Sequence, residues 1–201
     1  MRMDYIVKRS DRRTVSVTVD DDGRIIVKAG RGMSRAAVDR FVESSAPFIA
    51  RRLREIEAVD KAAESMGGAY TGQQISDMKA RARVFFTEKA SLYADLLGVS
   101  FSGISVKTQT TLWGSCSAKG ILSFNCLLMD APPFVAESVA AHEVCHLRHR
   151  DHGKAFYSEL RSVFPEYDKA KKWLRLNGRV LMRRLKLYLE TKDKTGRSKE
   201  N

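Results

Sequence analysis

The histidines of this chain are concentrated in one short segment with the residue types of a metal site. All four lie between residues 142 and 152, and the segment begins His142-Glu143-Val144-Cys145-His146. Histidines four residues apart on a helix are separated by about 6 Å along the axis and roughly 40° around it, so both rings can reach one ion. The pattern is H-E-x-x-H, in which the glutamate acts on water without binding the metal. It predicts His142 and His146 as metal ligands and Glu143 as the catalytic base.

Two further histidines are candidates for the third ligand. On an unbroken helix His149 faces the same way as His142, but it lies about 10 Å further along the axis, too far for metal–nitrogen bonds of about 2.0 Å. His152 can return to the site only if the chain turns after Leu147, and Asp151 is a good N-cap for a new helix. We therefore favour His152 as the third ligand and expect His149 to be exposed or to lie behind the ligands.

The donor set also indicates which metal is bound. Three neutral imidazoles favour zinc over magnesium or calcium, which prefer oxygen ligands. Zinc with three protein ligands keeps a fourth position for water and lowers the pKa of that water toward ~7. The chain has three cysteines, Cys116, Cys126 and Cys145, which offer a rival structural zinc site, but no C-x-x-C pair exists. We expect the cysteines to be ordinary reduced thiols and the histidines to hold catalytic Zn²⁺.

The elements that must position these residues begin with a sheet. Alternating apolar residues in the first thirty positions, with a turn at Asp20-Asp21-Asp22-Gly23, predict a small antiparallel β-meander. Ser34 is a good N-cap for a helix, and Pro47 is expected to open a second helix because proline is tolerated in the first turn. The polar and glycine-containing stretch 57–74 is the best candidate for a connection between two layers.

The second part of the chain is predicted to carry the site on a helix. A long helix from about Ser76 is expected to end at Gly98, and two strands are expected over 99–107 and 122–128. The helix that carries the histidines is predicted from Pro132-Pro133 to about Arg148, with apolar residues around most of its circumference. Two or three more helices follow, with breaks expected near Pro165 and Asn177-Gly178.

Composition excludes several classes of protein. The 201 residues contain 36 Lys plus Arg and 24 Asp plus Glu, a formal net charge of +12. No stretch approaches the ~18 apolar residues of a membrane span, and the first residues lack an apolar signal segment, so we expect a cytoplasmic protein that does not bind membranes. Residues 148–201 hold 16 basic and 7 acidic residues. This basic region can attract a nucleotide or nucleic acid, or it can be a solvated helical face.

The chain resembles the YgjP-like metallopeptidase family, whose members are cytoplasmic zincins distantly similar to SprT-like proteases. The resemblance is carried by Trp113-Gly114-Ser115-Cys116-Ser117, Leu122-Ser123-Phe124-Asn125, Leu128, Pro132-Pro133, the HEVCH motif, Asp151-His152, Phe156 and Pro165. It implies an α+β zincin-like fold with a strand alongside the cleft, zinc on His142, His146 and His152, and Glu143 as catalytic acid and base. We expect an N-terminal β-meander plus helices over 1–60, a catalytic region over 74–190 and a flexible charged tail over 191–201, in one compact unit.

The leading functional prediction is a zinc-dependent metallopeptidase that cleaves a peptide or protein. Nucleoside-triphosphate pyrophosphatase activity is also attached to the family, but the sequence shows neither a glycine-rich phosphate loop nor a cluster of carboxylates for magnesium. A DNA-associated, SprT-like protease that uses the basic C-terminal region is a further alternative. Trp113, Ser115 and Asn125 are candidates for contact with substrate, and packing and turn formation are the alternative roles for them.

Overall fold

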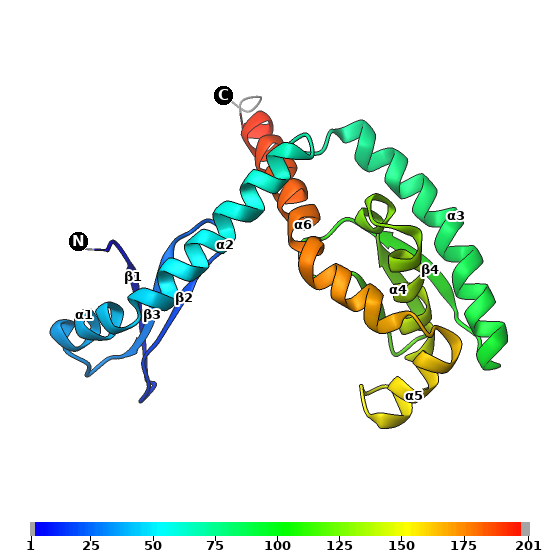
Figure 1. The fold of residues 1–201 in the computed structure, drawn as a ribbon, viewed down its shortest axis with the longest axis horizontal. Coiled ribbons are helices and arrows are strands. Elements are labelled where there is room, and N and C mark those ends of the chain that lie inside the picture. The colour runs from blue at the N-terminus through cyan, green and yellow to red at the C-terminus, as the bar shows by residue number, and fades with distance from the viewer. Residues whose placement is uncertain (1–2, 198–201) are drawn as a thin grey trace. The chain divides into compact units, whose positions relative to one another are not determined.

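The computed structural model describes residues 3–197, and contacts between Cα atoms divide the chain into two compact units, Met1–Ala62 and Ala63–Asn201. Each unit combines helices with a three-stranded sheet, so the predicted α+β class is confirmed (Figure 1). No helix in the described part of the chain has both the length and the apolar character that crossing a membrane requires.

The first unit has its strands before its helices. Its elements are β1 (Ile6–Ser10), β2 (Ser16–Val19), β3 (Ile25–Gly30), α1 (Arg35–Ser44) and α2 (Ala46–Ser65), the last of which continues past the boundary between the units. The Ser34 hydroxyl accepts a hydrogen bond from the Ala37 N–H and so caps α1. Pro47 lies in the first turn of α2, where its missing N–H costs no hydrogen bond. Both helix starts agree with the prediction.

The order of strands in this unit, β1-β3-β2, corrects the predicted antiparallel meander. β2 pairs antiparallel with β3, as expected for strands joined by a tight turn. However, β1 lies on the other edge of β3 and pairs with it in parallel, with Ile6 opposite Ile26. Alternating residues indicate which face of a strand is buried, here with Val27 fully enclosed. They do not indicate the neighbouring strand, because tertiary packing decides the pairing.

The second unit contains the histidine segment. Its elements are α3 (Gly72–Leu97), β4 (Gly103–Lys107), β5 (Gly114–Cys116), β6 (Ile121–Asn125), a 3-10 helix (Cys126–Asp130), α4 (Pro133–Cys145), α5 (Lys154–Val163) and α6 (Tyr167–Arg197). β6 is the central strand, parallel to β4 and antiparallel to β5. α3 begins four residues earlier than predicted because Thr71 and Gln74 form a capping box. It ends at Gly98, as predicted, where a φ of 61° suits glycine.

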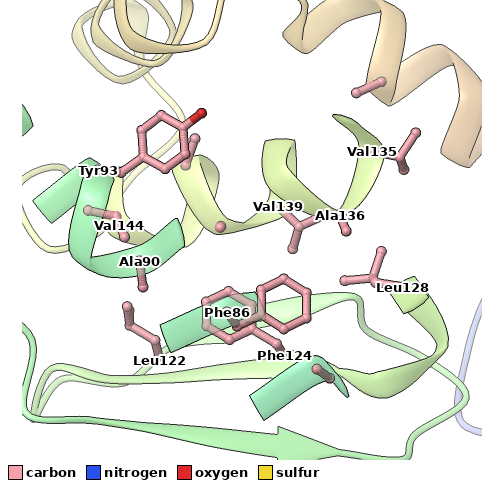
Figure 2. Close-up of a cluster of buried hydrophobic side chains, with 14 of the residues drawn as sticks. Phe86, Ala90, Tyr93, Leu122, Phe124, Leu128, Val135, Ala136, Val139 and Val144 are labelled. Carbon is pink, nitrogen blue, oxygen red and sulfur yellow. The ribbon is translucent and has the colours of Figure 1, made fainter. Parts of the chain in front are cut away.

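The core of the second unit packs α4 against α3 and β6. Phe86 of α3 stacks on Phe124 of β6 with ring centroids 4.2 Å apart, and Val139 of α4 belongs to the same buried cluster. Figure 2 shows side chains from these three elements pointing toward one another. Buried residues lie on most sides of α4, in agreement with the predicted apolar circumference. This packing holds the backbone of the HExxH helix in place.

The predicted break near Asn177-Gly178 is wrong, because α6 runs without interruption from Tyr167 to Arg197. Gly178 is tolerated inside the helix because Trp113 packs against it: a β-carbon at position 178 would lie 2.7 Å from Trp113 Cζ2. Residues 191–197, which were expected to belong to a flexible tail, continue the helix, and 198–201 lie outside the described residues. The glycine therefore serves close packing, which a sequence reading confuses with a helix end.

Candidate metal centre

Three histidines from the predicted segment meet at one point in the second unit. Their Nε2 atoms form a small triangle, with 3.2 Å between His142 and His146, 3.1 Å between His146 and His152, and 3.0 Å between His152 and His142. Within the described residues these three side chains form a group that could hold a metal ion. His142 lies in the last turn of α4, His146 caps that helix, and His152 lies just before α5.

The third histidine returns to the site because the chain turns where α4 ends. The helix stops at Cys145, three residues earlier than predicted, and the His149 N–H then donates to the Cys145 carbonyl at 2.9 Å. Asp151 does not cap α5 as expected, since the N-cap is Gly153. Instead the Asp151 carboxylate accepts the Gly153 N–H at 3.1 Å, which closes the turn that carries His152.

Each of the two helix histidines has a partner for its other ring nitrogen. His146 Nδ1 lies 2.9 Å from the His149 carbonyl oxygen, which only accepts, so this nitrogen carries the proton and Nε2 is left with its lone pair. His142 Nδ1 lies 3.4 Å from the Tyr167 hydroxyl. Such contacts fix the orientation and tautomer of imidazoles that bind metals. His149 therefore acts through its backbone, while its Nε2 lies 2.9 Å from Oε2 of the Glu159 carboxylate.

An aromatic ring behind the triangle keeps the three imidazoles in place. Phe156 of α5 is fully buried, and its ring centroid lies 4.9, 4.6 and 4.9 Å from those of His142, His146 and His152. Contact with one rigid ring restricts the rotation of all three side chains. Phe156 is one of the residues that carry the family resemblance, but its contact with the histidines depends on the turn between α4 and α5.

The donor set fits a tetrahedral zinc ion. Ligands bound at about 2.0–2.1 Å in tetrahedral geometry are about 3.3–3.4 Å from one another, close to the observed separations. Burial lowers the pKa of His142 to about 3, with further lowering by the positive charge of His146, His152 and Lys171. Burial also lowers the pKa of His146. These rings are thus neutral at pH 7, as metal ligands must be.

Glu143 projects from α4 into a pocket between the helix and the sheet. Its side chain is buried, with 5% of its surface exposed, and no described residue donates a hydrogen bond to its carboxylate. Burial raises its pKa to about 8. Gly114 of β5 provides the space, because a β-carbon there would lie 2.5 Å from Glu143 Oε1. An unpaired buried carboxylate is costly to the fold, which is typical of a group kept for function.

A cavity of about 300 Å³ opens beside His142 and Glu143. The residues that line it come from the segment before β6, from α4 and from α6: Trp113, Gly114, Ser138, Val139, His142, Glu143, Tyr167, Lys171 and Leu174. Trp113, one of the predicted substrate contacts, forms part of the wall. The Asn125 N–H donates to its carbonyl at 2.9 Å, and its ring packs on Gly178.

The other two predicted substrate contacts lie elsewhere. Ser115 is exposed on β5, opposite Ser123 of β6. Asn125 is fully buried, and its side-chain amide donates to the carbonyls of Gln109 and Leu112 at 2.7 and 2.9 Å. Its side-chain oxygen accepts the Leu127 N–H at 3.2 Å. Asn125 therefore shapes the loop before Trp113 and does not line the cavity.

The cysteines take no part in the histidine group in the described part of the chain. Cys126 and Cys145 are buried and Cys116 is half-buried, and all three are free thiols, as expected. Burial raises the pKa of Cys145 to about 12, which keeps it protonated at pH 7 although it precedes His146. Within the described residues the cysteines therefore give no support to a structural site that combines cysteine and histidine ligands.

Comparison with known proteins gives the family of the chain. The family model described as YgjP-like, metallopeptidase domain matches residues 69–177, which is more than half of the chain. The chain belongs to the YgjP-like family. The matched range covers the three histidines, Glu143 and every residue of the cavity wall. Membership of this metallopeptidase family supports a hydrolase, and it implies a bound metal ion and peptide or protein substrates.

Solved structures with partial similarity are metallopeptidase zymogens. The zymogen of abylysin from Pyrococcus abyssi is 18% identical with a TM-score of 0.42, and the match covers 47% of this chain and 96% of that one. The zymogen of jannalysin from Methanocaldococcus jannaschii is 20% identical with a TM-score of 0.41, covering 45% of this chain and 94% of that one. No curated protein matches this YgjP-like chain.

Proposed function

We propose that the chain is a zinc-dependent peptidase in which His142, His146 and His152 bind Zn²⁺ and Glu143 is the general base and acid. The observation that carries the proposal is the triangle of Nε2 atoms, 3.0–3.2 Å apart, with the Glu143 carboxylate in the wall of the adjoining cavity. The three nitrogens provide the ligands of a catalytic zinc site, which keeps one position open.

The chemistry divides between the metal and this carboxylate. Bound zinc supplies Lewis acidity, which polarises a peptide carbonyl and makes a water molecule more acidic. Glu143 accepts the proton of the attacking water as the oxygen bonds to the carbonyl carbon, and it donates that proton to the amine as the C–N bond breaks. The buried setting of Glu143 suits both steps, since the carboxylate lacks competing hydrogen-bond donors among the described residues.

The position of β5 favours a peptide as substrate. In the described residues β5 is an edge strand, paired only with β6, and its Gly114 lies against Glu143. Edge strands offer backbone groups to which an extended peptide can hydrogen-bond. We therefore propose that Ser115, exposed on β5, and Trp113, in the cavity wall, contact the substrate.

The alternatives from the sequence have less support. Arg148 and Arg150 are basic residues within the histidine segment, but both are engaged in the fold: Arg148 binds Glu159 and the Leu97 carbonyl, and Arg150 donates to the Ser117 carbonyl at 3.1 Å. They form no cradle for phosphate groups. None of the comparisons supports a nucleotide pyrophosphatase or DNA-associated proteolysis.

Metal content and hydrolysis test the proposal together. We expect purified protein loaded with zinc to retain about one zinc per chain by mass spectrometry and to cleave peptides from a mixed library. Glu143→Gln keeps the metal but lowers the rate by roughly 10²–10⁴-fold, the range of general acid–base catalysis. His152→Ala loses the metal, whereas His149→Ala, the matched histidine control, retains it.

A second carboxylate on α4 provides the control for the base. Glu137 accepts a hydrogen bond from Tyr93 at 3.0 Å and does not line the cavity, so Glu137→Gln is expected to cleave peptides at the wild-type rate. Hydrolysis at full rate by Glu143→Gln contradicts the assigned base. Release of pyrophosphate from nucleoside triphosphates by wild type, lost in Glu143→Gln, with no peptide cleaved, contradicts the peptidase assignment.

A further inference from the structure

The cavity beside Glu143 is lined by several apolar side chains and by one cation, Lys171. The apolar side chains include Trp113, Val139 and Leu174, and Lys171 of α6 is the cation in the lining within the described structure. The volume of about 300 Å³ lies at the lower end of the range for sites that hold small molecules, about 300–1,000 Å³. A space of this size and lining suits one large apolar side chain.

The walls of the cavity are held by residues of the second unit. Trp113 packs on Gly178, where any β-carbon would collide with it, and the Asn125 N–H binds its carbonyl. Val139 lies on α4 next to the buried core. The cavity is thus built before a ligand arrives, so little conformational entropy is lost when a side chain enters.

Lys171 is exposed to solvent, yet it is positioned beside the cavity. Its Nζ lies 5.4 Å from the ring centroid of Tyr157 and 5.9 Å from that of Tyr167, within the range of cation–π attraction of about 6 Å. No ion pair joins Lys171 to a carboxylate of the described residues. Asp168, one helical turn earlier, binds Arg161 through two hydrogen bonds of 2.9 and 3.2 Å. The ammonium group therefore remains available to a ligand.

We propose that this cavity selects peptides in which a large apolar side chain is followed or preceded directly by a carboxylate, with the apolar side chain in the cavity and the carboxylate beside Lys171. The inference rests on the proposed peptidase function and names the substrate class of the same site. The carboxylate can be the side chain of Asp or Glu, or the C-terminal carboxylate of the peptide. The excess of basic residues in 148–201 also favours the approach of acidic peptides.

The test compares matched peptides on the zinc-loaded enzyme. Each peptide carries one Phe, flanked by Glu, Gln or Lys, and each is made with a free or an amidated C-terminus. For wild type we expect kcat/KM to fall from Glu to Gln to Lys, by about three- to tenfold per step, as for a partly exposed ion pair. If the terminal carboxylate is the partner, a free C-terminus raises kcat/KM only in peptides that end directly after Phe, and amidation removes this gain.

Two lysines next to each other on α6 separate a local contact from the overall charge. Lys171→Glu is expected to reverse the preference, so that peptides with Lys become the better substrates. Lys172→Glu changes the net charge equally, but Lys172 is exposed and does not line the cavity, so it preserves the order. Thermal unfolding of both variants checks that the exposed substitutions leave the fold intact.

The apolar part of the site has its own pair of variants. Leu174→Trp fills the cavity and is expected to shift the preferred side chain from Phe to Ala. Leu176→Trp adds the same group on the same helix at a position that is 62% exposed and outside the cavity, and it retains the preference for Phe. Retention of the Phe preference by Leu174→Trp contradicts the assignment of the cavity.

Binding to the zinc-loaded Glu143→Gln variant distinguishes failure of this inference from failure of the proposed function. Calorimetry on the same peptides measures affinity without hydrolysis. If wild type cleaves no peptide while the affinities follow the order Glu, Gln, Lys and depend on Lys171, the peptidase function fails and the binding preference of the cavity stands. If peptides are cleaved but Lys171→Glu keeps the wild-type order, the inference is wrong and the function stands. Absence of both cleavage and binding overturns both.

Discussion

Two buried charged residues in the second unit have the same exposure and opposite surroundings. Arg184 of α6 and Glu143 of α4 are each 5% exposed. Arg184 forms an ion pair with Asp130 at 2.8 Å and donates to the Gly68 carbonyl at 2.9 Å. Its Cζ atom lies 4.0 Å from the centroid of the Tyr70 ring. Glu143 receives no hydrogen bond from the described residues, lies against Gly114 and lines the same cavity as His142.

The difference separates a structural charge from a reactive one. A buried charge with partners keeps its ionised form, and removing one partner leaves the other charge unpaired in the low-dielectric interior. A buried carboxylate without partners gains a raised pKa and can exchange a proton near neutral pH. Arg184 thus connects the segment before α3 to the core, whereas Glu143 is held at some cost to stability where chemistry can use it.

The largest expected effect comes from breaking the partnered charge. Arg184→Met removes the cation from Asp130, whose side chain is 37% exposed and still accepts a hydrogen bond from Tyr70, so the free energy of unfolding is expected to fall by about 2–3 kcal/mol. Hydrolysis per folded molecule stays unchanged, because Arg184 does not line the cavity beside Glu143. Urea denaturation followed by circular dichroism measures the loss. The double variant Arg184→Met, Asp130→Leu recovers most of it, and equal stability of Arg184→Met and wild type contradicts the structural role.

The next test adds a methyl group beside the Glu143 carboxylate. Gly114→Ala places a β-carbon 2.5–2.9 Å from the Glu143 carboxylate, so this group must move from its present position. Displacement of a catalytic group by about 1 Å can cost 10²-fold in rate, and we expect a fall of that order in kcat with zinc retained. Gly103→Ala in β4, where nothing lies within 4 Å of the added carbon, is the control and keeps its rate. An equal rate for both variants contradicts the expected displacement of the Glu143 carboxylate.

The smallest effect concerns stability and pH in the metal-free protein. The pKa of Glu143 rises from 4.5 in the unfolded chain to about 8 in the folded chain. Between these values the folded protein holds a proton that the unfolded chain has lost, so the free energy of unfolding decreases as pH rises from 5 to 8. Glu143→Gln lacks this contribution. From pH 5 to pH 8 the free energy of unfolding of Glu143→Gln is therefore expected to rise by roughly 1–3 kcal/mol relative to that of wild type.

Denaturant titrations at both pH values measure that difference. Taking the difference between variant and wild type removes the opposite trend from His142, whose lowered pKa makes the folded protein less stable as pH falls. Glu88→Gln, at a site whose side chain is 72% exposed on α3, controls for the change in net charge. A difference that stays constant from pH 5 to pH 8 contradicts the raised pKa of Glu143.

Much of the fold was predictable where one local rule decides the outcome. Ser34, Pro47 and Gly98 mark helix ends through capping and proline chemistry, and all three positions agree with the structure. The pairing of β1 with β3 was missed, because the same alternation suits either edge of the sheet. Gly178 was interpreted as a helix break, because its contact with Trp113 joins positions 65 residues apart.

The sequence by itself determined the identity and spacing of the histidine segment. The i, i+4 rule brings His142 and His146 together on any helix, and a separation of about 10 Å along the axis disfavours His149 relative to His152. Only the tertiary structure decided the turn that returns His152, the contact of Tyr167 with His142, and the position of Lys171 beside the cavity. The physical reason is that helix geometry acts over a few residues, whereas the packing of α6 against α4 joins residues about 30 apart and leaves no periodic signal in the chain.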